Sequence, residues 1–535
     1  MKQIEIPLIK DRKASYRFFE MLPGMLSWTI LILPFVIALT NVRLAAYLMI
    51  GYLLLWFLKA IALNIRVIQG FRTLKQHEKI KWQHLIDDVV LGEVTELKAP
   101  KWHATNIKRI VDTPNGIHPR EVIHAVIVAT YNEVREVLEP TIAAVLSSDF
   151  DPKKIILLLA YEERGGESVD IQAKQLIEDY KDNFLYAEAV KHPDGMPNEV
   201  IGKGGNITFA GRRLQQIIEQ KGIDPKQVLV TTLDSDNRPH PQYFAGLTYV
   251  FGVCYNPSNL SFQPIPMFTN NIWDVPALMR VIATSNSFWM LVQSLRPHML
   301  RNFSAHAQPL DALIKTDFWS TRTIVEDGHQ FYRSYFAFDG HHEVVPIFLP
   351  IYQDAVLAKG YRRTLKAQFI QMRRWAWGAS DIAYVAHKGF LTKNNMNKTD
   401  ITFKFLRLLE GHISWATSPL ILLYGALLPS LFHSKNLLAV QLPLIASNIE
   451  TIALSTILLS MFLSFKILPP KPARYKNHHN VLMVLQWVLL PVTTICYSSF
   501  AAIYSQTRLM LGRYIGAFDV TEKAVKTDSG TITSL

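Results

Sequence analysis

Apolar residues gather in long stretches toward both ends of the chain. Near the N-terminus, residues 23–40 and 44–65 are two such stretches with a short polar turn between them. Each is long enough to cross the ~30 Å hydrocarbon layer of a membrane. The first lacks the small-x-small site of a cleaved signal peptide and runs directly into the second. We therefore predict that residues 1–65 form a cytosolic N-terminal tail and a transmembrane hairpin.

The C-terminal third is apolar again. Residues 413–432 form one predicted span, and residues 437–467 form another, which Pro443 interrupts. The loop 466–476 carries four basic residues and no acid. Basic loops stay on the cytosolic side of a membrane, so this loop is predicted to be cytosolic. Residues 391–480 are thus expected to hold an interfacial segment and transmembrane helices.

The last apolar stretch, residues 481–511, raises a problem of topology. Thirty-one residues are too few for two crossings of ~20 residues each. A single crossing would put the basic segment behind it outside the cell. We predict that the stretch lies in the interface or re-enters at Pro491, with the rest of 481–535 forming a loop and a tail. The chain would then have four transmembrane helices and both termini in the cytosol.

Between these regions the pattern changes to short β-rich runs separated by helical segments. The runs are 122–129, 155–160, 184–190 and 228–233, and the helical segments are 134–146, 168–180 and 206–220. This alternation predicts an α/β domain over residues 121–390, with a Rossmann-like, mostly parallel sheet. Residues 66–120 are amphipathic, and we interpret them as a lead-in that lies along the membrane.

Composition supports a membrane protein. Hydrophobic residues make up 49% of the chain and charged residues 19%, and the net charge is +12. The basic residues cluster beside the apolar spans, which favours a multi-pass membrane protein, expected in the plasma membrane, with its central domain in the cytosol, and argues against nucleic acid as a partner. Cys254 and Cys496 provide no disulfide framework and no metal-ligand spacing. The sequence does not define an oligomeric state.

The fourth β-rich run ends in Asp234-Ser235-Asp236. Ligands of open α/β sheets bind beyond the carboxyl ends of the strands. Two carboxylates at this position suit one Mg²⁺ or Mn²⁺ shared with a diphosphate. The alternative is an ordinary Asx turn, because Asp is common in turns.

Further short motifs follow a fixed order around this one. Thr130-Tyr131-Asn132-Glu133 closes the first run, and Lys203-Gly204-Gly205-Asn206 opens a helix. Later come Glu326-Asp327 and the helical segment Gln371-Met372-Arg373-Arg374-Trp375. The Gly-rich motif could hold phosphate on the amides of a helix N-terminus, or it could be a plain turn.

This ordered set resembles the membrane-embedded family 2 glycosyltransferases, the group that contains cellulose, chitin and hyaluronan synthases. The resemblance covers residues 120–385 by motif and the flanking spans by architecture. Phe518-Asp519-Val520-Thr521-Glu522-Lys523 also matches the Phe-x-Val-Thr-x-Lys gating loop of cellulose synthases. The resemblance implies a GT-A fold, a nucleotide-sugar donor and an inverting transfer.

The resemblance also implies roles for residues. Inversion in one step needs one carboxylate to deprotonate the acceptor hydroxyl, and Asp327 matches the family's catalytic acid. Asp234 and Asp236 would bind the metal ion, while Glu326 could be structural. The expected substrate-binding residues are Thr130, Tyr131, Glu133, Glu162, Lys203, Asn206, Asp234, Gln371, Arg374, Trp375, Phe518, Val520, Thr521 and Lys523. The helix with Gln371 could equally place its Arg and Trp against lipid headgroups.

Some positions depart from the family pattern. Tyr161-Glu162-Glu163 stands where the family carries Asp to contact the base, so the nucleotide is left open. Residues 303–308 lack the family's usual sequence, which leaves the acceptor contacts undefined. His329, His341 and His342 have no metal-ligand spacing, and we expect them to be solvated loop residues.

Three functions are compatible with these observations. One is synthesis of a polysaccharide from a cytosolic nucleotide sugar, with or without coupled export. Another is transfer of a single sugar to a lipid acceptor. The last is a non-enzymatic membrane transporter or sensor with a nucleotide-binding domain, although such a protein needs no base at Asp327.

Overall fold

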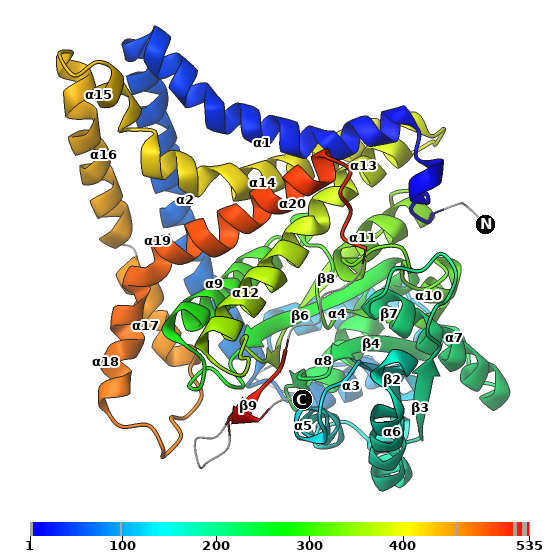
Figure 1. Cartoon of the computed structure of the whole chain (residues 1–535). Coiled ribbons are helices and arrows are strands. Elements are labelled where there is room, and N and C mark those ends of the chain that lie inside the picture. Colours follow the sequence, from blue (N-terminus) through cyan, green and yellow to red (C-terminus); the bar gives the residue numbers. More distant parts are fainter. Residues whose placement is uncertain (1–3, 97–98, 456, 517–521, 527–531, 534–535) are drawn as a thin grey trace.

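The computed structural model describes residues 4–96, 99–455, 457–516, 522–526 and 532–533. An eight-stranded sheet forms the centre of its α/β domain, in the order β3-β2-β1-β4-β7-β6-β8-β5 (Figure 1). The first four strands in this order pair with one another in parallel. The next pair, β4 with β7, is antiparallel. The four parallel strands are β1 (Ile123–Thr130), β2 (Ile155–Glu162), β3 (Tyr186–His192) and β4 (Val228–Asp234).

The connecting helices are α5 (Arg135–Leu146), α6 (Glu167–Tyr180) and α7 (Lys203–Lys221). Strands and helices thus alternate as the sequence predicted, and the α/β class with a mostly parallel sheet is confirmed. The position of this domain between apolar helical segments is confirmed as well.

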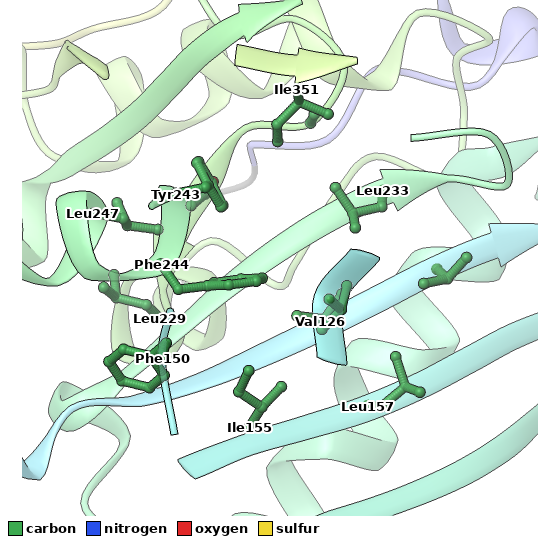
Figure 2. Close-up of a cluster of buried hydrophobic side chains, with 14 of the residues drawn as sticks. Val126, Phe150, Ile155, Leu157, Leu229, Leu233, Tyr243, Phe244, Leu247 and Ile351 are labelled. Atoms are coloured by element: carbon green, nitrogen blue, oxygen red, sulfur yellow. The ribbon is translucent and has the colours of Figure 1, made fainter. Parts of the chain in front are cut away.

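Both faces of the sheet are covered, which explains why its strands read as continuous apolar runs. All eight residues of β2 are buried. On one face, Tyr243, Phe244 and Leu247 of α8 (Tyr243–Val253) belong to the same packed cluster as Val126 and Leu229 (Figure 2). On the other face, α7 packs on β1 and β2.

Residues 244–335 contain further regular elements, of which β6 and β7 join the sheet. They are β6 (Leu260–Phe268), α9 (Ala277–Ser294), β7 (Ala307–Pro309), α10 (Leu310–Lys315) and α11 (Glu326–Ala337). They are followed by β8 (Glu343–Gln353), which pairs with β6 in parallel and with the two-residue β5 (Arg238–Pro239) in antiparallel fashion. Because β7 has only three residues, no periodicity marks it in the sequence.

The lead-in packs on this domain. It forms the end of α2 (Val42–His77), then α3 (Trp82–Leu91) and α4 (Lys101–Asp112). Trp82 is buried in the cluster beneath α8, and His103 bonds to Asp88 and Tyr249 in the interior. The apolar faces of α3 and α4 thus cover α8, and the placement of this segment along the membrane stays a prediction.

Apolar helices project from one side of the domain (Figure 1). Among the described residues, Ala14–Thr40, Val42–His77 and His478–Met510 are long and apolar enough to cross a membrane. The first two are α1 and α2. They pack with α14 (Lys398–Tyr424) and α16 (Leu437–Ser455) through Leu31, Leu53, Ile421 and Leu442. The remaining elements here are α15 (Leu428–Phe432) and α17 (Ile457–Ile467).

The stretch 478–510 comprises α18 (His478–Leu485), α19 (Leu490–Val492) and α20 (Phe500–Met510), and the 3-10 segment Gln486–Leu489 and the π-helical segment Thr493–Ser499 join them into one helical run. It runs diagonally between α12 (Tyr361–Ala376) and α14 (Figure 1). Arg280 of α9 donates to Gln486 at 2.6 Å, and Ser505 donates to the carbonyl of Arg373 at 2.7 Å. The stretch is among those long and apolar enough to cross a membrane, so its predicted placement in the membrane interface stays a prediction.

Candidate active site

A cavity of about 840 Å³ lies at the carboxyl ends of the parallel strands. Segments that are far apart in the sequence line it together. They contribute Thr130, Tyr131, Glu133, Glu162, Lys203, Asn206, Asp234, Asp236, Asp327, Gln371, Arg374, Trp375 and Lys523. The structure thus gathers in one place every predicted site residue that it describes.

Lys203 connects the strand end to the predicted base. As the first residue of α7 it is buried, and its Nζ lies 2.9 Å from Asp234 and 3.5 Å from Asp327. Glu326 is 4.0 Å from the same nitrogen. Burial by itself would lower the pKa of Lys203, but the surrounding carboxylates raise it above its ordinary value. Lys203 is therefore a permanent cation at the centre of the site.

The two adjacent acids at the start of α11 differ in environment. Glu326 is buried, and burial together with the neighbouring Asp327 raises its pKa. The Asp327 side chain is 21% exposed, so it is the one that a substrate can reach. This division fits a structural Glu326 beside an accessible Asp327.

His306 lies next to Asp327 as well. Its Nδ1 is 3.7 Å from the Asp327 carboxylate and donates to the carbonyl of Phe303 at 2.9 Å. Trp319 donates to the other ring nitrogen at 3.1 Å. Because Nε2 accepts a hydrogen bond, the ring is the neutral Nδ1–H tautomer. Burial agrees, since it lowers the pKa of His306.

Asp234 is held in its charged form. Burial would raise the pKa of this carboxyl, but Lys203, Lys523 and a 2.7 Å hydrogen bond from Ser304 keep it below its ordinary value. Ser304 lies in the segment before β7, where the sequence offered no signal. It reaches Asp234 because β7 pairs with β4.

Asp236 faces a second lysine. Lys523 Nζ lies 2.8 Å from Asp236 and 2.6 Å from the Ser235 hydroxyl. The backbone of Asp354 donates to Asp236 at 2.9 Å, and one carboxylate oxygen of Asp354 is buried without a hydrogen-bond partner. Burial and the nearby Asp236 raise the pKa of Asp354. Sequence reasoning missed Asp354, although it directly follows the strand β8, as Asp234 ends β4.

The segment with Lys523 comes from the far end of the chain. The backbone of Lys523 forms an isolated parallel β-bridge with Leu357, and Ala524 donates its backbone N–H to the Leu357 carbonyl at 3.0 Å. Its neighbour Glu522 pairs with Arg363 at 2.9 Å. Phe518, Val520 and Thr521, the other predicted residues of this loop, lie outside the described residues.

The motif after β1 supports the strand ends. Glu133 accepts bonds from the Thr130 hydroxyl at 2.7 Å, the Tyr131 backbone at 2.8 Å and the Ser235 hydroxyl at 3.1 Å. Burial would raise the pKa of Glu133, but Lys523 and these donors lower it. Glu133 thereby ties β1 to β4 and to the C-terminal segment.

The Gly-rich motif brings α7 close to the strands. Asn206 donates to the carbonyls of Ala160 at 2.9 Å and Thr130 at 3.3 Å, so it links the ends of β2 and β1. A Cβ on Gly204 would lie 2.3 Å from the carbonyl oxygen of Ser320, which only glycine avoids. These contacts give the motif a structural task in addition to the placement of Lys203.

Glu162 is engaged by a neighbour. Arg164 forms two hydrogen bonds to its carboxylate, and the guanidinium lies 3.9 Å from the centre of the Tyr131 ring. The three side chains therefore form one stack at the mouth of the cavity. Arg164 was not among the predicted site residues.

The helix α12 contributes Gln371, Arg374 and Trp375 to the cavity wall. Gln371 accepts from Gln368 at 3.1 Å, and Trp375 packs against Phe268 with ring centres 6.2 Å apart. The helix thus presents this face to the cavity, and its other side contacts α20.

Two of the three histidines that were expected in solvated loops are buried. His329 is buried and bonds Asp381 at 2.7 Å, and His342 is buried and bonds Ser261 at 3.0 Å. The expectation of solvated loop residues is wrong for these two, because α11 and β8 place them in the interior. Among the described residues, no group of three or more His, Cys, Asp or Glu side chains could hold a metal ion.

The fold and the cavity define an α/β protein with a lysine- and carboxylate-lined site at its strand ends, joined to apolar helices. No protein-family model and no curated protein matches the sequence. The chain resembles solved structures at low identity. One is a mannosyltransferase from Pyrobaculum calidifontis in complex with GDP-Man and Mn²⁺, with TM-score 0.40, 12% identity, and coverage of 84% of this chain and 98% of that chain.

Two further similar structures are S. aureus TarS in complex with UDP-GlcNAc and GalNAc-T7 with UDP, GalNAc and Mn²⁺. The first has TM-score 0.35 and 10% identity, covering 77% of this chain and 97% of that chain. The second has TM-score 0.31 and 10% identity, covering 55% and 58%. Such distant likenesses define no activity, so the function must be argued from the side chains of the cavity.

Proposed function

We propose that the protein transfers a sugar from a nucleotide-sugar donor to an acceptor hydroxyl, with inversion, at the cytosolic face of the plasma membrane. The observation that carries this proposal is the link through Lys203. One buried ammonium lies within 3.5 Å of both the strand-end Asp234 and the accessible Asp327. A cation beside a departing nucleoside diphosphate stabilises the negative charge that develops on it.

In this proposal Asp327 accepts the proton of the acceptor hydroxyl as its oxygen attacks the sugar carbon. Lys203 and Lys523 face the negative charge that develops on the departing diphosphate, and Arg374 adds a third cation to the same wall. The stack of Tyr131, Arg164 and Glu162 offers an aromatic face and polar groups for the nucleotide base.

A divalent cation fits the residues at Asp236. Asp354 and Asp236 both line the cavity, one carboxylate oxygen of Asp354 has no hydrogen-bond partner, and both side chains are hard oxygen donors. Mg²⁺ is commonly held by one or two carboxylates together with substrate phosphates, so the lack of a larger cluster among the described residues is no obstacle. When bound, Mg²⁺ or Mn²⁺ would supply positive charge for the leaving diphosphate. Lys523 would have to leave Asp236 for the cation to bind there.

Nucleotide release by the purified protein tests the proposal. With a panel of radiolabelled nucleotide sugars and Mg²⁺ or Mn²⁺, we expect one donor to release its nucleotide. Asp234→Asn and Asp236→Asn should both abolish this turnover. Wild-type rates in either variant, measured in EDTA-treated and Mg²⁺-restored membranes, would contradict the roles of these carboxylates. A transporter or sensor would bind nucleotide without releasing it from a sugar.

The orientation can be tested separately. If both termini are cytosolic, Thr527→Cys in a background without Cys254 and Cys496 should resist a membrane-impermeant maleimide in intact cells. The same cysteine should react after lysis. Labelling in intact cells would place the C-terminus outside and contradict the role of Lys523 at a cytosolic site.

The sequence leaves two acceptors open, a growing polysaccharide and a lipid.

A further inference from the structure

The cavity continues past Asp327 into an arm that the donor does not need. Here its lining comes from α14, from α9 and from Leu63 of α2. We call this part the acceptor arm; its lining includes Leu63, Trp289, Arg301, Phe403, Arg407 and Trp415. Its residues come mostly from helices on the apolar side of the molecule (Figure 1).

One peptide segment connects the arm to the donor site. The Ser304 hydroxyl donates a hydrogen bond to Asp234 at 2.7 Å, and Arg301 donates to the Tyr332 hydroxyl of α11 at 3.3 Å. Three residues span at most about 10 Å of extended chain. The Arg301 backbone therefore lies within that distance of the Ser304 backbone, so an acceptor headgroup at Asp327 is within reach of the arm.

A single face of α14 lines the arm. Phe403, Arg407, Gly411 and Trp415 are spaced by four residues and all border the cavity, with Lys404 and His412 beside them. Residues four apart share one side of a helix. The face thus presents basic groups together with large apolar and aromatic surfaces, the combination that a charged headgroup on an acyl or isoprenoid chain requires.

Buried polar atoms in the arm lack partners. Both amide atoms of Asn302, a ring nitrogen of His412 and the indole nitrogen of Trp487 have no hydrogen bond, and these side chains are at most 7% exposed. Leaving such groups unsatisfied is costly, on the order of 1–3 kcal/mol each. Asn302, His412 and Trp487 all border the cavity, so a headgroup with oxygen atoms would bring acceptors and donors to this region.

The rim of the arm is apolar and open. Leu63, Trp289 and Phe403 are 41%, 39% and 54% exposed. Among the described residues, none of α1 or α16 lines the cavity, and α14 contributes nothing beyond Trp415. At the level of the apolar helices, α1, α2, α14 and α16 pack directly on one another. Among the described residues, the cavity lining therefore does not extend along these packed helices.

We propose that the acceptor is a membrane lipid with a phosphate in its headgroup and a free hydroxyl, which enters the acceptor arm sideways between α14 and α9. This rests on the proposed function. Arg301, Lys404 and Arg407 would bind the phosphate, and the rim would contact the apolar chain. A polysaccharide in extrusion would instead need a continuous polar path between the packed helices.

The presence of a base selects the nucleophile. The acceptor hydroxyl oxygen forms a bond to the anomeric carbon, and the bond from that carbon to the diphosphate breaks with its electron pair on phosphate oxygen. The hydroxyl proton moves to Asp327. A lipid phosphate attacking directly would have no proton to give, so the phosphate is an anchor in this proposal and the hydroxyl reacts.

The test uses the full chain in detergent, labelled nucleotide sugars and three kinds of vesicle. Phosphatidylglycerol and phosphatidylinositol carry both a phosphate and free hydroxyls, whereas phosphatidylcholine has a phosphate and no hydroxyl. We expect organic-phase label with the first two, one sugar per lipid, and none with the third. Arg407→Glu should reduce this label at least tenfold.

Arg212→Glu is the matched control. Arg212 on α7 is exposed like Arg407, and each pairs with one exposed acid, at 3.1 and 2.9 Å. This control should keep the wild-type yield of glycolipid. Equal losses in the two variants would overturn the proposal, because the charge change alone would then explain them.

The remaining outcomes separate this proposal from the function on which it rests. Nucleotide release with label only in a water-soluble ladder, or with no organic-phase label at all, overturns the lipid acceptor and leaves sugar transfer intact. Absence of nucleotide release with every donor overturns both. Equal organic-phase label with phosphatidylcholine also overturns the lipid assignment, since that lipid offers no hydroxyl.

Discussion

Replacement of Asp327 by asparagine isolates the proton-transfer step. The variant has nearly the same shape but cannot accept the proton of the acceptor hydroxyl. Loss of a general base typically lowers a rate by about 10²- to 10⁴-fold. At 1.36 kcal/mol for each factor of ten, this corresponds to about 2.7–5.4 kcal/mol in the activation free energy. We expect a loss of turnover in that range.

The structure predicts that donor binding survives this change. Lys203 keeps Asp234 as a partner at 2.9 Å when the more distant Asp327, at 3.5 Å, loses its charge. Asp327 also makes no hydrogen bond through Oδ1 that the fold would lose. The dissociation constant of the nucleotide sugar should therefore stay within about threefold of wild type, a change below ~1 kcal/mol.

Single-turnover rates and calorimetric titration with the donor measure the two quantities separately. Glu326→Gln is the matched control, because the raised pKa of Glu326 already favours its neutral form. This control should lose no more than about tenfold in rate, the equivalent of ~1.4 kcal/mol. If Asp327→Asn lost binding and turnover equally, or if Glu326→Gln had the larger effect on rate, the assignment of the base would be refuted.

Three further changes have defined outcomes. Lys523→Met should tighten Mn²⁺ binding in the absence of donor on the order of tenfold, because Lys523 no longer holds Asp236 through one charged hydrogen bond. Electron paramagnetic resonance measures this binding, and weaker binding would contradict competition between Lys523 and the metal ion for Asp236. Gly204→Ala should destabilise the fold by about 1–3 kcal/mol in thermal unfolding, because its Cβ meets the Ser320 carbonyl, whereas Gly51→Ala, with open space, should not. Burial raises the pKa of Asp354 in the fold, so wild-type stability falls as the pH rises from ~4 through that raised pKa. Asp354→Asn removes this loss, and its melting temperature should exceed that of wild type at about pH 8 but not at about pH 4.5; an equal difference at both pH values would contradict the shift.

The local pattern was sufficient where an element buries residues with a regular period. The continuous apolar runs of β1, β2 and β4 predicted strands buried on both faces, because crossover helices cover both faces of a parallel sheet. The same pattern therefore places the acids that follow these strands at one edge of the sheet. The apolar stretches of α1 and α2 were equally plain from length and composition.

The sequence by itself thus determined the α/β class, the helices at its flanks and the positions of Lys203, Asp234 and Asp327 in one site. Only the tertiary structure decided the partners that act across long separations. Lys523 reaches Asp236 over 287 positions, and Ser304 reaches Asp234 through a three-residue strand. Asp354 and the acceptor arm likewise arise where segments without a periodic pattern meet. The physical reason is that periodicity records which face of an element is buried, whereas contacts between distant side chains depend on how the elements pack.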